Sequence, residues 1–113
     1  MKRRIERRIT NLNKTLGGKL VRPGSLQFGI DQYSQNKNVF KKNAYLIRSI
    51  GIDHPFSDFN KTTTINITIE NFQKAGLKCN EQAYIKGVIG MIKRGETNIP
   101  RIEKNLRKWC KKT

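Results

Sequence analysis

Apolar residues recur at helical spacing along almost the whole chain, and this periodicity constrains the fold more than any other feature. The first stripe consists of Ile5, Ile9, Leu12 and Leu16. Residues three or four positions apart share one face of an α-helix, and Lys and Arg fill much of the other faces here. We therefore predict an amphipathic, strongly basic helix over about residues 2–16, ended by Gly17-Gly18.

Start and stop signals predict two further helices in the first half of the chain. Ser25 is placed to cap the second helix, and the polar run 34–38 breaks it. A third apolar stripe extends over residues 39–51, and the approach to Pro55 disfavours its continuation. We expect a short loop between these two helices, and the His54 segment to begin where the third helix ends.

The second half contains two clearer helices and one ambiguous segment. Asn80 is placed to cap a helix that closes at Gly95, and Pro100 lies in the first turn of the last helix. The segment Thr64–Ile69 alternates like a half-buried strand, yet its isoleucines and Phe72 also follow helical spacing. Propensity taken alone favours a strand there.

Size and composition fit one core. A length of 113 residues is common for one domain, and the 35% of hydrophobic residues excludes a disordered or fibrous class. We predict a single domain spanning residues 1–113, built as an all-α, compact bundle of about six helices.

The formal net charge of +16 is concentrated at the two ends of the chain. Residues 1–22 hold eight Lys or Arg against one Glu, and residues 101–113 hold six against one. Such ends attract polyanions, including nucleic acid and acidic protein segments, and the charge alone does not choose among them.

The cysteines and the hydropathy indicate an intracellular protein. Cys79 and Cys110 lack the spacing of a zinc site or a redox motif, so we expect reduced thiols. No apolar run follows the basic start, and no segment approaches the ~20 residues of a membrane span. We expect a cytoplasmic location and no membrane contact.

Groups that phosphate chemistry uses lie close together in residues 54–61, HPFSDFNK. His54 is the only histidine, and an imidazole accepts a hydroxyl proton readily near neutral pH. Asp58 offers a hard oxygen ligand for Mg²⁺, and Lys61 offers a cation for phosphoryl oxygens. If Asn60 and Lys61 begin a helix, their backbone N–H groups add an anion site.

This segment resembles the motif of the Fic/Doc family, in which His-x-Phe-x-Asp/Glu-Gly/Ala-Asn is followed by Gly in Fic enzymes and by Lys in Doc toxins. Lys61 puts the resemblance on the Doc side. Weaker similarity at residues 21–26 and 95–99 extends it over roughly residues 20–110. The resemblance implies an all-helical fold in which Thr64–Ile69 is part of a helix.

The resemblance also implies a toxin-like protein transferase that uses ATP and Mg²⁺ to modify a protein hydroxyl. Doc-like phosphoryl transfer is favoured over Fic-like adenylyl transfer (AMPylation). The implied site comprises His54 as catalytic base, Asp58 for Mg²⁺ and, for nucleotide and phosphate, Phe56, Asn60, Lys61 and Thr62. The implied partners are a target protein with a Ser, Thr or Tyr hydroxyl, by analogy a translation factor, and an antitoxin.

Two positions depart from the family pattern. Phe59 stands where the family has Gly or Ala, and its ring could crowd the approach of phosphate to the backbone. Thr62 stands where the family usually has Arg, which removes a bidentate phosphate clamp. The alternative is therefore a catalytically inert Fic/Doc-fold binding module whose basic ends bind nucleic acid or an acidic, antitoxin-like partner.

Overall fold

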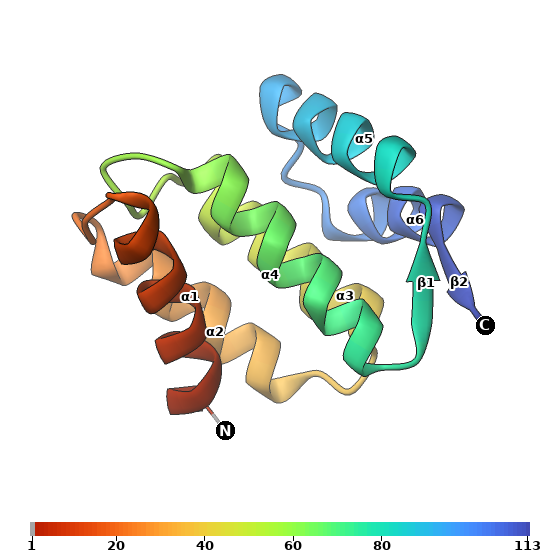
Figure 1. Ribbon diagram of the computed structural model, residues 1–113, viewed down its shortest axis with the longest axis horizontal. Coiled ribbons are helices and arrows are strands. Elements are labelled where there is room, and N and C mark those ends of the chain that lie inside the picture. The colour runs from red at the N-terminus through yellow and green to blue at the C-terminus, as the bar shows by residue number, and fades with distance from the viewer. Residues whose placement is uncertain (1) are drawn as a thin grey trace.

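The computed structural model describes residues 2–113, which form a mainly helical bundle (Figure 1). Its elements are α1 (Lys2–Leu16), α2 (Pro23–Gln35), α3 (Val39–Leu46), the π-helix η1 (Ile47–Ile52), α4 (Asn60–Lys74), β1 (Leu77–Cys79), α5 (Glu81–Arg94), α6 (Ile99–Trp109) and β2 (Cys110–Lys112). The prediction of an all-α bundle of about six helices is confirmed, as is the basic helix over residues 2–16. No helix within the described residues is both long enough and apolar enough to cross a membrane.

Helix α4 crosses the middle of the molecule, with α1 and α2 on one side and α5 and α6 on the other (Figure 1). One apolar cluster joins α1, α2, η1 and α4, and it includes Ile9, Ile30 and Ile67. A second cluster joins α3, α4, α5 and α6, with Phe72 and Tyr84 among its largest side chains. Because α4 contributes to both clusters, it is packed from two sides.

The ambiguous segment Thr64–Ile69 lies inside α4, as the family resemblance implies and against its strand propensity. The hydroxyl groups of Thr64 and Thr68 donate to the carbonyl oxygens four residues earlier, so neither polar group is left unpaired in the core. Packing on both sides of α4 therefore outweighs the preference of β-branched residues for strands.

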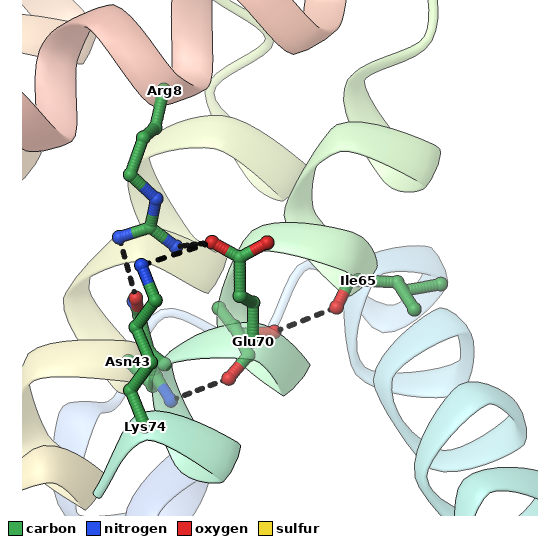
Figure 2. A network of polar contacts seen from close by, with 7 residues as sticks. Arg8, Asn43, Ile65, Glu70 and Lys74 are labelled. Carbon is green, nitrogen blue, oxygen red and sulfur yellow. Dashed lines mark hydrogen bonds and ion pairs between the residues drawn. The ribbon is translucent and has the colours of Figure 1, made fainter.

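A polar network fixes α4 against α1 and α3 (Figure 2). The guanidinium group of Arg8 in α1 pairs with Glu70 and donates to the side chain of Asn71, both in α4. Asn71 donates in turn to Asn43 of α3, whose amide donates to the carbonyl oxygen of Thr68. Three helices are thus joined by one network, in which Asn43, Asn71 and Thr68 are buried and Glu70 is exposed.

Two details of the second and third helices differ from the sequence prediction. Helix α2 begins at Pro23, because proline suits the first position of a helix. The predicted cap Ser25 lies inside the helix, and α2 has no side-chain cap. The stripe over residues 39–51 is one α-helix that widens into η1, where the N–H of Asp53 donates to the carbonyl of Arg48 five residues earlier.

The expectation of reduced thiols is wrong in this structure, because Cys79 and Cys110 form a disulfide. The bond lies on a two-stranded antiparallel ladder that the sequence analysis did not predict, in which β1 pairs with β2. Cys79 and Cys110 are directly opposite each other in this ladder although 31 positions separate them in the chain. The disulfide therefore closes a loop that contains α5 and α6.

Candidate functional site

The motif segment forms the loop between η1 and α4, and the segment that follows α1 holds it in place. Leu20 and Phe56 form an isolated antiparallel bridge. On one side of this bridge Lys19 and Ser57 bond reciprocally: the N–H of Ser57 donates to the carbonyl of Lys19 over 2.8 Å, and the N–H of Lys19 donates to Ser57 Oγ over 3.0 Å. The loop therefore behaves as one strand of a short, irregular pair.

Further bonds fix both ends of this loop. The N–H groups of Val21 and Arg22 both donate to the carbonyl of Pro55, and Arg22 Nη1 donates to the carbonyl of His54 over 2.7 Å. At the other end, the buried Asn13 of α1 donates from Nδ2 to the carbonyl of Asp58 over 2.9 Å. The backbone around the predicted catalytic residues is thus bonded at five consecutive residues, 54–58.

His54 and Phe59 are the two non-glycine residues with positive φ within residues 2–113, and they delimit this loop. His54 has a φ of 53° directly before Pro55, where a proline usually favours extended backbone. Phe59 adopts the left-handed conformation, with φ 63° and ψ 26°. Such conformations are costly for residues with a Cβ and persist where surrounding contacts impose them, as they frequently do at functional sites.

Asn60 ties the loop to the start of α4 through both groups of its side-chain amide. Its Oδ1 accepts from the N–H of Phe56 over 3.1 Å, and its Nδ2 donates to the carbonyl of Phe56 over 3.0 Å. The side chain of Phe56 is itself buried in the cluster shared by α1, α2 and α4. The sequence prediction placed both residues in a nucleotide and phosphate site; the structure assigns their side chains to holding the loop.

The other predicted residues gather around one shallow hollow of about 360 Å³. Its lining consists of His54, Ser57, Asp58, Phe59, Asn60, Lys61 and Thr62. Five of the six predicted site residues therefore line it, and Phe56 lies outside it. His54, Asp58 and Lys61 are all exposed, so a base, a carboxylate and a cation reach solvent from the same hollow.

The first turn of α4 lines the hollow and favours an anion. Helix α4 has no side-chain cap, so the backbone N–H groups of residues 60–62 have no intrahelical acceptor. Lys61 adds a full positive charge beside the positive end of the helix dipole. A phosphate or another small oxyanion is the ligand that this arrangement suits.

Asp58 is the only carboxylate in the lining of the hollow. Its Oδ1 accepts from the N–H of Phe59 over 2.7 Å, which leaves the second oxygen for another partner. Within residues 2–113 no three His, Cys, Asp or Glu side chains lie close enough to form a metal centre. One carboxylate oxygen fits Mg²⁺ that arrives already bound to nucleotide phosphates, because Mg²⁺ often takes only one or two protein carboxylates and keeps water and phosphate ligands.

Sequence reasoning missed the residues that position the loop, namely Asn13, Lys19 and Arg22. The Gly17-Gly18 pair was interpreted only as the end of a helix, Lys19 only as part of the basic end of the chain, and Arg22 as part of that end and of the weak family similarity at residues 21–26. The sequence signal for this contact is the second glycine of the pair, Gly18. A Cβ at this position would lie 2.8 Å from the carbonyl oxygen of Asp58. The close approach of this segment to the motif loop therefore requires glycine there.

Comparison with known proteins adds no assignment to this geometry. No family model matches the chain, and the search of curated proteins finds no match either.

Proposed function

We propose that this protein transfers a phosphoryl group from Mg-ATP to a hydroxyl group of a protein, as its resemblance to Doc toxins implies. The observation that carries the proposal is the hollow in which His54, Asp58 and Lys61 meet the uncapped start of α4. A base, a carboxylate, a cation and a helix N-terminus are the parts that phosphoryl transfer to a hydroxyl requires.

The proposed reaction assigns one role to each group. A His54 ring nitrogen accepts the proton of the target hydroxyl while its oxygen forms a bond to the γ-phosphorus. The bond between that phosphorus and the bridging oxygen breaks, and ADP leaves with the electron pair. Lys61 and the N–H groups of residues 60–62 hold the phosphoryl oxygens, and Thr62, which also lines the hollow, adds a hydroxyl group. Asp58 would hold Mg²⁺, which supplies neutralising charge to the phosphates.

The conformation of Phe59 supports the resemblance that underlies this proposal. Position 59 is Gly or Ala in the Fic/Doc motif, and the left-handed backbone here is one that glycine adopts without steric cost. The Phe59 ring extends toward Gly17, where a Cβ would lie 3.4 Å from its Cε2 atom. The ring therefore lies partly over the end of α1 while also lining the hollow.

Calorimetry of ATP binding with and without Mg²⁺ tests the site first. We expect Mg²⁺-dependent binding that weakens about tenfold or more in Lys61→Ala, because a charge-assisted phosphate contact is lost. Lys86→Ala is the matched control, since it removes an exposed lysine from α5, away from the hollow. Absence of binding at millimolar ATP would refute the proposal and favour the non-catalytic module.

Label transfer then identifies the reaction. We expect label from γ-labelled ATP on a protein in a cell extract, and its loss in His54→Ala with ATP binding retained. Label that arrives only from α-labelled ATP would establish adenylyl transfer in place of phosphoryl transfer. The labelled protein, cut out and sequenced, identifies the target, for which a translation factor is the expectation by analogy.

A further inference from the structure

Two lysines face each other across the β1–β2 ladder. Lys78 is the direct partner of Lys111, and the next pair joins Leu77 to Lys112. Directly opposed side chains on antiparallel strands lie close together, and like charges in such a pair destabilise the sheet. The disulfide between Cys79 and Cys110, one position along, keeps this pair together. The ladder therefore holds two positively charged side chains close together although they repel each other.

The lysine pair belongs to a larger group of cations, here called the C-terminal basic surface. Its members are Lys37, Lys78, Arg107, Lys108, Lys111 and Lys112, all of them exposed. They line two adjoining hollows of about 550 and 500 Å³ that share Lys111 and Lys112. No Asp or Glu side chain lines either hollow, and none of the six cations belongs to an ion pair within residues 2–113.

One cation of the surface, Arg107, is fixed by the fold, and the aromatic side chains near the surface are not free to bind. The Arg107 guanidinium lies 4.3 Å from the centre of the Phe40 ring, which orients it beside the start of α3. Trp109 packs edge-on against Tyr84, and a Cβ on Gly87 would lie 2.1 Å from its ring. Because this ring is used in packing α5 against α6, it offers no platform for stacking a base.

We propose that the C-terminal basic surface binds nucleic acid through its phosphate backbone, without reading the sequence. An array of unpaired cations in a protein of net charge +16 matches a ligand with regularly repeated negative charges. A protein partner would instead be expected to bury large apolar side chains. The exposed ones, Leu20, Val21, Phe28, Phe59 and Ile85, all lie on other elements. None of them lines the two hollows.

Fluorescence anisotropy with a labelled single-stranded 20-nucleotide DNA or RNA of mixed sequence tests this proposal. The triple variant Lys78→Ala/Lys111→Ala/Lys112→Ala should bind at least tenfold more weakly at about 0.15 M salt, and the slope of log K against log salt should fall by about 2. The control Arg3→Ala/Arg4→Ala/Arg7→Ala removes three exposed cations from α1. It should weaken binding less than threefold.

The two variants have the same net charge, +16 less three, or +13. Equal weakening in both would show that overall charge alone drives binding, and this would overturn the proposal. Poly-glutamate of similar length is the competitor: if it displaces the oligonucleotide at equal charge concentration, the surface binds acidic protein and the proposal fails.

The melting temperature of the triple variant should equal or exceed that of the wild type, because the opposed lysines are gone. His54→Ala should leave nucleic-acid binding unchanged, so this test is independent of the proposed transferase activity.

Discussion

The disulfide between Cys79 and Cys110 should contribute most of its stability by restricting the unfolded chain. It closes a loop of 31 positions that contains α5 and α6, and cross-linking a loop of this length lowers the entropy of the unfolded state. At 25 °C the loop-closure relation gives about 3.7 kcal/mol for such a loop. This is a large share of the 5–15 kcal/mol, roughly, by which a domain is usually stable.

Replacing both cysteines by alanine removes the cross-link. Urea unfolding followed by far-ultraviolet circular dichroism should show the midpoint falling by roughly 2.5 M, taking a denaturant slope of about 1.5 kcal/mol per molar. The variant should remain helical, because Tyr84 and Trp109 still pack α5 against α6 and the second apolar cluster persists. Its denaturant slope should increase slightly, since a chain without the cross-link expands more on unfolding.

The reduced wild type is the matched control, because it keeps both sulfur atoms. The difference between the reduced wild type and the double alanine variant measures the packing of the buried Cys110 side chain, and the difference between oxidised and reduced wild type measures the cross-link. Alkylation of the denatured protein before and after reduction, counted by mass spectrometry, establishes the starting state. Two alkylated cysteines without reductant, or a midpoint unchanged by reduction, would refute the reasoning.

Three further changes test the packing around α4, each measured by urea unfolding. Asn60→Asp should lower the free energy of unfolding by about 2–3 kcal/mol, because it removes the donor to the Phe56 carbonyl and leaves a carboxylate that is only 7% exposed. Gly51→Ala should lower the free energy of unfolding by about 1–3 kcal/mol, because the new Cβ would lie 2.6 Å from Ile92 Cδ1. Valine lacks this atom, so adding Ile92→Val should recover part of that loss in the double variant. Tyr84→Phe should cost about 1 kcal/mol at pH 7 through loss of a buried hydroxyl bond, and this cost should shrink as the pH rises from 9 to 11.

The cost of Tyr84→Phe depends on pH because burial raises the pKa of Tyr84 above its ordinary value. The hydrogen bond from its hydroxyl to Thr68 lowers the pKa, but by less. The unfolded chain loses this proton near pH 10, whereas the folded chain keeps it. The protonated Tyr84 hydroxyl therefore contributes fully to the free energy of unfolding below about pH 10. This contribution is lost as the pH rises further, by at most about 1.4 kcal/mol per pH unit. A cost of Tyr84→Phe that stays constant through this range would contradict the burial argument. Additive costs for Gly51→Ala and Ile92→Val would contradict a direct contact, and an unchanged stability in Asn60→Asp would contradict the tie to Phe56.

Local signals predicted the helices well because they depend on nearby residues alone. Asn80 caps α5 and Gly95 ends it in a left-handed conformation, as expected from the sequence. The segment Thr64–Ile69 could not be decided locally, because β-branched residues favour a strand until packing on both sides of α4 is known. The Cys79–Cys110 bond was missed for the same reason: it depends on β1 and β2 meeting across a helical hairpin.

In the candidate site too, features that depend on nearby residues could be predicted, and features that depend on tertiary contacts could not. The grouping of His54, Asp58 and Lys61 around one hollow could be predicted because these residues are close in sequence and precede a helix start. The partners of the loop could not, since Asn13 and Arg22 reach it only through the tertiary pairing of two distant segments. The side-chain amide of Asn60 bonds the backbone of Phe56, and the motif alone did not reveal this role.

The bonds that Asn13 and residues 19–22 make to the motif loop affect the rate at which a ligand binds and the entropy that binding costs. A loop that is free before binding loses conformational entropy when a ligand orders it, and affinity falls accordingly. Here that entropy is lost during folding, because Lys19, Arg22 and Asn13 already hold the loop in one conformation. A ligand at the hollow should therefore associate without a slow ordering step, and loss of the bonds from Asn13 and Arg22 should make the same motif more flexible and its binding weaker.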